Sequence, residues 1–422
     1  MNELKQANRR DFLKGATAAA AGIALAGGLN LAQAAYAAGS DELKIALVGC
    51  GGRGTDATSQ CLSKCGNVKL IAMADAFADN AKTSLAELRK DEEIAGKIDV
   101  PEDRIFVGFD AYRKAIAAGP DIVLLTTPPG FRPIHYAAAI AAGKHVFMEK
   151  PCCVDAPGFR SLMETNKLAD EKGLKVAVGL QRRHSKEFLG KVKRIQDGSL
   201  GNLILLRAYW NNGDIWIRPR LPEQTEMEYQ MRNWYHFVWL CGDHILEQHV
   251  HNLDVCNWVK GDHPVKANGM GSCHIRNNRG VGQIYDNHFV EFTYKDGSTM
   301  LSQCRQQPHV WNIVTQFVHG AKGAQELPGN GSDGYVQEHV DLVNAIRKGE
   351  KLNDGWHGAT SSFTAILGRM ATYSGKEVNW KEAVAKGPSE MPKKFAFDAN
   401  PPAMPDKDGN YPQPVPGEYK PY

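Results

Sequence analysis

A glycine-rich turn near residue 50 has the residue types and spacing of a phosphate-binding loop. Residues 48–54 read VGCGGRG, which contains the pattern GxGxxG between a predicted strand and a predicted helix. Glycines at these positions let backbone N–H groups and the N-terminus of the helix reach a pyrophosphate. The pattern predicts a dinucleotide site that includes Gly49, Gly51, Gly52, Arg53 and Gly54.

An acidic residue ends the next predicted strand, residues 68–76. Asp75 stands where a carboxylate would bind the 2′-hydroxyl of the adenosine ribose and repel a 2′-phosphate. The sequence therefore predicts NAD as the cofactor and makes NADP the less favoured one. The alternative is a plain tight turn with Asp75 as a surface carboxylate.

The elements around this loop alternate between strands and helices. Predicted strands at residues 44–49, 68–76, 105–109, 121–126, 145–149 and 175–180 are separated by helical segments. This alternation predicts a Rossmann fold, an α/β doubly wound parallel sheet, over residues 41–180.

The pattern changes after residue 180. Residues 203–210, 288–294 and 299–304 alternate as half-buried strands do, and helical patterns appear at 242–260, 337–348 and 357–374. We expect a C-terminal α+β domain over residues 181–386, with a large and mostly antiparallel sheet. Residues 387–422 are rich in proline, which predicts an extended arm over the surface or over a partner subunit.

The first forty residues have the features of an export signal. Residues 8–14 read NRRDFLK, a weakly apolar Ala/Gly-rich run follows, and small-residue cleavage sites end it. Residues 1–40 therefore predict export by the twin-arginine machinery and a periplasmic location after cleavage. A cytosolic protein with a disordered tail is the alternative. No other window is suited to span a bilayer.

Charge and cysteine content exclude several classes of protein. The formal net charge of +3 gives no broad field to attract nucleic acid. The nine cysteines have neither CxxC nor Cys/His zinc spacing, so they predict neither a disulfide framework nor a zinc finger.

A second group of residues follows two later Rossmann strands. Residues 126–129 read TTPP, His135 follows, and residues 142–151 read AGKHVFMEKP. From the glycine motif to this EKP segment the chain resembles the glucose-fructose oxidoreductase, inositol dehydrogenase and rhizopine-catabolism (Gfo/Idh/MocA) family. The resemblance covers roughly residues 43–375. It implies cofactor contacts for Thr126, Thr127, Pro128, His135, Glu149, Lys150 and, after the last Rossmann strand, Arg183.

The resemblance also implies a role for the lysine of the EKP segment. It places Lys150 beside the nicotinamide and the reacting hydroxyl, with Glu149 near the nicotinamide ribose. A neutral lysine amine can take the hydroxyl proton as hydride leaves the carbon. Without the surrounding motif, Lys150 would be taken as an exposed residue at a strand end.

A third group lies in residues 241–258, whose ending, H-x-x-D-x-x-x-W, is similar to the catalytic helix of this family. The resemblance implies an acid/base pair of His251 with Glu247, four residues earlier on a helix. We expect Asp254 to orient the imidazole. His244, Glu247, His249 and His251 are also possible metal ligands. Their spacing matches no established ligand pattern, and we predict no metal.

Aromatic and polar residues near these groups suit a carbohydrate. Our candidate substrate contacts are Lys150, Tyr235, His249, His251 and Trp216. Many of the aromatic residues in this stretch would serve equally well as core residues.

These observations and the resemblance together favour one enzyme class. We expect an NAD(P)-dependent oxidoreductase that moves hydride at a secondary carbinol of a sugar, glycoside or cyclitol. The periplasm has no expected pool of nicotinamide, so the cofactor should be tightly bound. The alternative is an NAD-dependent, redox-neutral glycosidase or lyase. A third hypothesis is a sugar-binding module. The family resemblance also implies a homo-oligomer.

Overall fold

The computed structural model describes residues 42–276 and 281–422. Within it, Leu43–Tyr422 form one compact unit. The predicted signal segment, residues 1–40, lies outside the described residues. The predicted domain boundaries at residues 180 and 386 stay a prediction, because this unit contains both sheets.

The first sheet is six-stranded and entirely parallel, in the order β3-β2-β1-β4-β5-β6. Its strands are β1 (Leu43–Val48), β2 (Val68–Asp75), β3 (Ile105–Val107), β4 (Ile122–Leu125), β5 (His145–Met148) and β6 (Val176–Val178). The order reverses between β1 and β4, which opens a crevice at the carboxyl ends of the strands where ligands bind in such sheets. The predicted Rossmann fold is confirmed.

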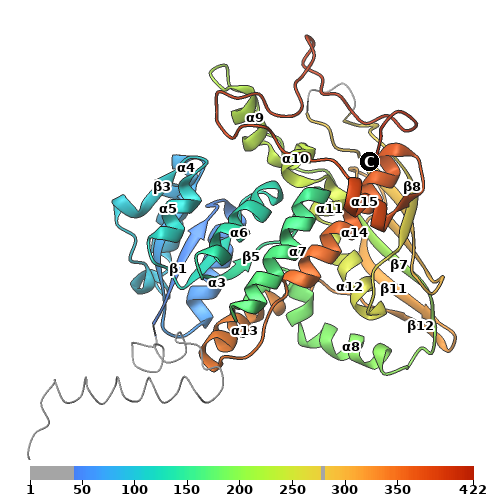
Figure 1. The fold of residues 1–422 in the computed structure, drawn as a ribbon, viewed down its shortest axis with the longest axis horizontal. Coiled ribbons are helices and arrows are strands. Elements are labelled where there is room, and N and C mark those ends of the chain that lie inside the picture. Colours follow the sequence, from blue (N-terminus) through green and yellow to red (C-terminus); the bar gives the residue numbers. More distant parts are fainter. Residues whose placement is uncertain (1–41, 277–280) are drawn as a thin grey trace, which may run out of the picture. The chain divides into compact units, whose positions relative to one another are not determined.

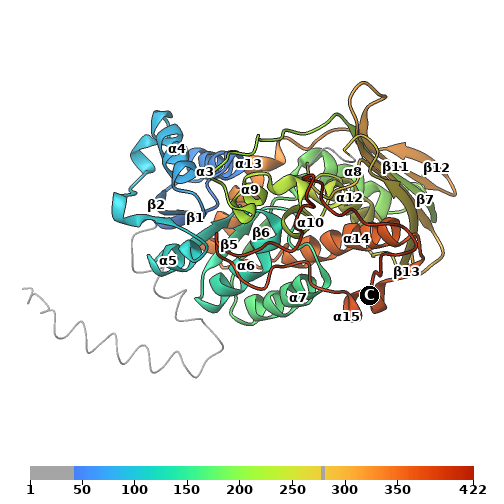
Figure 2. The same cartoon turned by 90° about the horizontal axis from the view of Figure 1, so that it is seen from above.

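Helices cover both faces of this sheet, as Figure 2 shows. On one face lie α3 (Gly52–Lys64), α4 (Ala78–Lys90) and α13 (Gly334–Lys348); on the other lie α5 (Ala111–Ala117), α6 (Arg132–Ala141) and α7 (Ala156–Glu171). The central strands are apolar on both sides because both faces are covered. Helix α13 comes late in the sequence, so a distant segment completes the Rossmann core.

The second sheet has the order β12-β11-β7-β10-β9-β8-β13 and is antiparallel except for the pair β7–β10. Its strands are β7 (Leu203–Asn212), β8 (Lys266–Ser272), β9 (Asn287–Thr293), β10 (Thr299–Gln306), β11 (Ile313–Gly320), β12 (Gly323–Glu326) and β13 (Val378–Asn379). The hairpin β9–β10 turns at Gly297, which has a φ of +84°. The predicted mostly antiparallel sheet is confirmed.

Helices of the second half pack on one face of this sheet (Figure 1). They include α12 (Val250–Lys260) and α14 (Gly355–Ser374), whose apolar residues share a core with β9 and β10. The remaining helices are α8 (Lys186–Gln196), α9 (Glu226–Arg232), α10 (Val238–Cys241), α11 (His244–Glu247) and α15 (Trp380–Lys386).

The helical segment predicted over residues 242–260 contains two helices, α11 and α12, with a short interruption at Gln248 and His249. Helix α10 ends just before this segment, at Gly242, which has a φ of +78°, and Asp243 follows with a φ of +80°. A right-handed helix cannot continue through residues with positive φ. These two residues therefore separate α10 from α11, and the predicted helical segment is confirmed apart from the interruption.

The proline-rich arm, residues 387–422, contains neither helix nor strand and packs on the chain's own surface. Gln230 of α9 donates a hydrogen bond to the carbonyl of Ala403, and Tyr285 donates to the carbonyl of Pro414. At its start, Phe397 packs on Phe109 with ring centroids 4.9 Å apart. The arm thus connects the rim of the first sheet with α9 and the start of β9.

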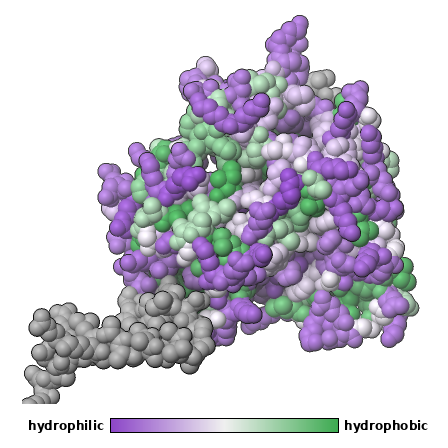
Figure 3. Space-filling model, in the orientation of Figure 1, coloured by the Kyte–Doolittle hydropathy of each residue, from purple (hydrophilic) through white to green (hydrophobic). Residues whose placement is uncertain are grey.

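The surface of the molecule is mixed in character. On the face drawn in Figure 3, hydrophilic residues surround smaller hydrophobic patches. No helix within residues 42–276 and 281–422 is both long enough and apolar enough to cross a membrane.

A buried histidine ties the turn after β6 to distant elements. The Nδ1 of His184 lies 2.6 Å from Asp341 of α13, and its Nε2 lies 3.2 Å from Asp354. Burial alone would lower the pKa of His184, but hydrogen bonds with Asp341 and Asp354 outweigh burial and raise the pKa to about 10.

The raised pKa of His184 predicts a loss of stability in mild alkali. A raised folded-state pKa stabilises fully below the unfolded pKa of about 6.5, and this stabilisation is lost as the pH rises towards about 10. We expect His184→Gln to cost about 2 kcal/mol near neutral pH and to flatten the fall of melting temperature above it. Melting curves of both proteins across this range, with His274→Gln as control, measure the effect. Equal slopes for all three proteins would refute it.

Candidate active site

A cavity of about 460 Å³ lies at the carboxyl ends of the first sheet's strands and is also lined by residues of the second half. Most of the site residues predicted from sequence line it. They are Gly49, Gly51, Gly52, Arg53, Gly54, Asp75, Thr126, Thr127, Pro128, His135, Glu149, Lys150, Tyr235, Glu247 and His251. The cavity has the size usual for small-molecule sites.

The glycines of the loop have two different structural roles. A Cβ on Gly54 would lie 2.0 Å from the carbonyl oxygen of Gly49, so Gly54 lets α3 pack closely against the end of β1. A Cβ on Gly51 or Gly52 would meet no atom within 4 Å. These two glycines therefore leave open space in the cavity, in front of the N-terminus of α3.

Alanine at two of these glycines should separate folding from binding. Gly54→Ala should lower the free energy of unfolding by about 1–3 kcal/mol, because its new methyl group overlaps the Gly49 carbonyl. Gly51→Ala should fold normally, since its φ of −77° suits alanine, but weaken dinucleotide binding by at least roughly tenfold because the methyl group blocks a pyrophosphate. Melting temperature and cofactor titration measure both effects; the same pattern in both variants would contradict the assignment.

Asp75 ends β2 at the rim of the cavity. Its carboxylate accepts hydrogen bonds from the backbone N–H of Cys50 at 2.7 Å, from that of Phe77 at 2.9 Å and from the Asn80 side chain at 3.2 Å. Burial raises the pKa of Asp75, and these three hydrogen bonds oppose the shift. The donors fix the carboxylate in position beside the glycine loop.

Two buried carboxyl groups hold Arg53 against the wall of the cavity. Its Nε lies 2.5 Å from Glu149 and its Nη2 lies 3.7 Å from Glu338 of α13, while its guanidinium covers the ring of Tyr335 at 5.2 Å. Burial and the nearby Glu149 raise the pKa of Glu338 well above its usual value. These contacts of the Arg53 guanidinium are therefore all with other side chains of the protein.

The floor of the cavity is formed by residues that follow β4. Thr126 donates a hydrogen bond to the carbonyl of Gly49 at 2.5 Å, and Thr127 contacts the Nδ1 of His135 at 3.2 Å. His135 stacks on Tyr112 with centroids 4.1 Å apart. Burial, with a contribution from Arg132, lowers the pKa of His135 to about 3, which makes it a neutral, flat surface.

Lys150 links the two halves of the site. Its Nζ donates hydrogen bonds to the carbonyl oxygen of Glu247 at 2.5 Å and to Oε1 of Glu247 at 3.0 Å. Burial raises the pKa of Glu247, while Lys150 opposes the shift. Since an ammonium group has three N–H donors, one N–H of Lys150 has no partner in these two bonds.

His251, at the start of α12, lines the same cavity and stacks on Trp210 of β7 with centroids 6.0 Å apart. Burial, followed by the positive charge of Lys150, lowers the pKa of His251 well below its usual value. The imidazole is therefore neutral near pH 7 and able to accept a proton.

The prediction that Asp254 orients this imidazole was wrong. The carboxylate of Asp254 accepts bonds from the Nε and Nη2 of Arg183 at 2.8–3.0 Å and from Ser361 at 2.7 Å. The Nδ1 of His251 has no hydrogen-bond partner among the described residues. One turn further along α12, Asp254 faces α14 instead.

Three predicted site residues do not line the cavity. Arg183 forms the ion pair with Asp254 and covers the ring of Trp258. His249 is buried and contacts Ser302 at 2.8 Å. Trp216 is 45% exposed and packs on the rings of His236 and of Trp234, which itself lines the cavity. Their cofactor and substrate roles stay predictions that their positions do not favour.

Other residues of the cavity wall were not predicted from sequence. Gln248 follows Glu247, and Gln306 of β10 donates to both its side-chain oxygen at 3.0 Å and the hydroxyl of Tyr235 at 2.9 Å. This network leaves the O–H of Tyr235 free to donate. Gln248 lies inside the predicted catalytic segment, so its neighbours in the sequence could have indicated that it lines the site. Tyr335 lies in no sequence motif that would indicate such a role.

Comparisons with known proteins agree with this architecture. Residues 43–180 match the model of an oxidoreductase family with an NAD-binding Rossmann fold, GFO_IDH_MocA, and residues 6–26 match the twin-arginine translocation pathway signal sequence. The chain is thus an exported protein of the twin-arginine pathway.

Among curated proteins, the chain is similar to inositol 2-dehydrogenases. It is 28% identical to the Klebsiella pneumoniae enzyme over 221 residues, which are 52% of this chain and 55% of that protein. Over 343 residues, 74% of this chain and 92% of the relative, it is 25% identical to the Rhizobium meliloti enzyme. The match with the Klebsiella enzyme thus spans only about half of that relative's length.

Solved structures show the same fold. Scyllo-inositol dehydrogenase from Lactobacillus casei, with bound NAD(H) and scyllo-inositol, superposes with a TM-score of 0.63 at 17% identity, covering 81% of this chain and 99% of that one. The glycine loop, Asp75 and the EKP segment all fall within the family match at residues 43–180. The chain therefore carries the NAD-binding Rossmann domain of the Gfo/Idh/MocA oxidoreductase family behind a twin-arginine signal sequence.

Proposed function

We propose that this protein is an NAD-dependent oxidoreductase that acts on a secondary carbinol of a cyclitol or sugar. The observation that carries the proposal is the convergence of Lys150, Glu247 and His251 on the cavity that also contains the glycine loop. A proton-transfer group and a cofactor loop in one enclosed space are what hydride transfer from an alcohol requires.

The residues present fit NAD. Gly51 and Gly52 leave room for a pyrophosphate at the N-terminus of α3, and the fixed Asp75 carboxylate suits a ribose diol and repels a 2′-phosphate. When bound, NAD supplies a hydride acceptor or donor at the nicotinamide ring.

Residues of the chain itself would then position the substrate oxygen and transfer its hydroxyl proton. The N–H of Lys150 not used by Glu247 is available to hold the substrate oxygen. The neutral imidazole of His251 can take the hydroxyl proton during oxidation and return it during reduction. Glu247 fixes the lysine amine and, with its pKa raised by burial, can share that proton.

The substrate class is argued from the wall of the cavity and from the relatives. Trp210, Trp234 and Tyr235 supply flat apolar faces, while Gln248 and the Tyr235 hydroxyl supply hydrogen bonds. Such a mixture suits a ring that carries several hydroxyl groups. The curated relatives described above are inositol dehydrogenases, which favours a cyclitol over a glycoside.

The first test is the absorbance of reduced nicotinamide in purified, unsupplemented protein, before and after a panel of cyclitols and glycosides, with products analysed by mass spectrometry. Accumulation of bound NADH together with a keto product is expected. Release of an aglycone with no net change in cofactor redox state would instead establish the redox-neutral glycosidase. Bound cofactor with no product from any compound would favour a binding module.

We also propose a division of labour along the chain. Residues 41–180 would hold the cofactor, residues 181–386 would supply the substrate wall and an oligomer contact, and the arm 387–422 would contact both.

The sheet face opposite α12 and α14 carries half-buried apolar residues such as Tyr209, Leu301 and Phe317, which supports association of identical chains through it. Light scattering on Leu301→Glu should show a smaller particle than wild type; an unchanged mass would exclude this face.

A further inference from the structure

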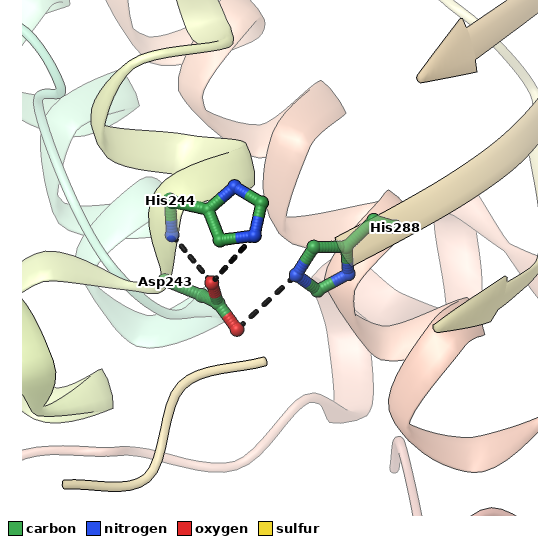
Figure 4. A group of neighbouring side chains, drawn as sticks. All are labelled: Asp243, His244 and His288. Atoms are coloured by element: carbon green, nitrogen blue, oxygen red, sulfur yellow. Dashed lines mark hydrogen bonds and ion pairs between the residues drawn. The ribbon is translucent and has the colours of Figure 1, made fainter. Parts of the chain in front are cut away.

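Outside the cavity, one buried cluster has the residue types of a metal centre. Asp243 precedes α11, His244 begins it, and His288 comes from β9 (Figure 4). One ligand atom from each lies within 4.8 Å of the other two, and all three side chains are fully buried. The cluster shares no residue with the cavity wall.

Two polar neighbours contact the ring of His288. Its Nδ1 lies 2.9 Å from the hydroxyl oxygen of Thr372 of α14, which also lies 3.0 Å from the carbonyl oxygen of Arg369. The Nε2 of His288 faces Oδ2 of Asp243 at 3.2 Å. When Thr372 donates to Arg369 and accepts from the Nδ1–H of His288, the Nε2 carries no hydrogen and is available to bind a metal ion beside the carboxylate.

His244 is the member of the cluster whose ring makes no hydrogen bond. Both of its ring nitrogens are buried and have no hydrogen-bond partner among the described residues, and its Nε2 lies 3.9 Å from Oδ1 of Asp243. A hydrogen bond between His288 and Asp243 would leave both His244 nitrogens unsatisfied, which is costly in the interior. A metal ion between the three side chains would give the Nε2 of His244 a partner and would bind Asp243 and His288 at the same time.

Two arginines that interact electrostatically with the cluster also pair with other carboxylates. Arg276 lies 2.5 Å from Asp214, and Arg369 lies 3.1 Å from Glu390. The ion pairs recorded for Asp243 within the described residues are with the two histidines.

Neighbouring groups orient the carboxylate. Asp243 also accepts bonds from Tyr373 at 2.5 Å and from the N–H of Tyr285 at 3.0 Å. Outer partners of this kind usually orient metal ligands.

We propose that Asp243, His244 and His288 form a structural site for a divalent zinc-type ion. Two imidazoles and one carboxylate bind zinc in proteins when a water completes the tetrahedron, and ligand bonds of about 2.0–2.1 Å require the three ligand atoms, which lie within 4.8 Å of one another, to draw closer together. Because Leu246 and Glu247 both donate backbone bonds to the Asp243 carbonyl, the ion would hold the turn that presents Glu247 to Lys150. The site goes beyond the proposed oxidoreductase function and does not depend on it.

The test begins with metal analysis of the full exported protein purified without chelator. About one zinc ion per chain is expected, resistant to chelators in the native state because the ligands are buried. His244→Gln and His288→Gln should each reduce the zinc content at least roughly tenfold, whereas His274→Gln, which changes an exposed histidine, should retain it.

A second measurement decides the matter even if those variants do not fold. Wild-type protein is unfolded with chelator and refolded with zinc, with cobalt or without metal. The proposal expects a melting temperature several degrees higher with zinc, and the visible absorption of cobalt bound to nitrogen and oxygen ligands. Metal-free purified protein that melts identically after all three treatments would overturn it, leaving a hydrogen bond between His288 and Asp243. Zinc retained by both cluster variants would overturn it equally.

Discussion

Lys150→Met is expected to lower kcat by roughly 10²- to 10³-fold, the loss usual when a positioned hydrogen-bond donor to the reacting oxygen is removed. Methionine keeps the apolar stem of the side chain but removes the amine that bonds Glu247 at 2.5 and 3.0 Å. Because the glycine loop and Asp75 are untouched, the affinity for NAD should change little. The measurement is steady-state turnover of whichever cyclitol or sugar the product screen identifies, together with NAD titration.

The control for this experiment is Lys167→Met, which removes a lysine whose side chain is 76% exposed on α7. It should leave both turnover and NAD binding unchanged. A Lys150→Met enzyme that keeps full turnover would remove Lys150 from the reaction. Joint loss of turnover and NAD affinity would instead make Lys150 a cofactor-binding residue.

Asp75→Ser is expected to reverse or abolish the preference for NAD over NADP. The substitution removes the charge that would repel a 2′-phosphate and the acceptor for the ribose hydroxyl. A lost hydrogen bond to a charged group is worth about 1.5–3 kcal/mol, so the affinity for NAD should fall by about tenfold to a hundredfold while that for NADP rises. Titration of cofactor-free protein with both dinucleotides gives the two affinities.

An exposed aspartate on α3 provides the matched control. Asp56→Ser makes the same change of charge outside the cavity wall and should leave both affinities as they are. If Asp75→Ser retained the wild-type preference, the three hydrogen bonds to Asp75 would be purely structural, serving only to connect β2 with the glycine loop.

The parallel sheet and the glycine loop were predictable because their signals are local. The apolar runs of β1, β2 and β4 are short and are bounded by glycine or polar residues, as buried parallel strands are. Lys150 and Glu247 could be proposed as neighbours only through the family resemblance, because they are almost a hundred residues apart in the chain.

Other features depend on contacts that no local pattern reveals. The positive φ values of Gly242 and Asp243 separate α10 from α11, and a further interruption at Gln248 and His249 separates α11 from α12. Asp254 prefers the guanidinium of Arg183 to the imidazole of His251, because an arginine fork binds a carboxylate through two donors. Tyr335 reaches the cavity only because α13 packs beside α3.

The pairing of β7 with β10 and β11 leaves this strand without partners while much of the chain is being synthesised. Strand β7 leaves the ribosome well before its two neighbours, since β10 and β11 follow α9–α12 in the chain. Until residue 306 has emerged, both edges of β7 lack their partners, and the edge that pairs with β11 stays open until residue 320. The interval before these strands pair is therefore the period in which the newly made chain is most exposed to pairing with other chains.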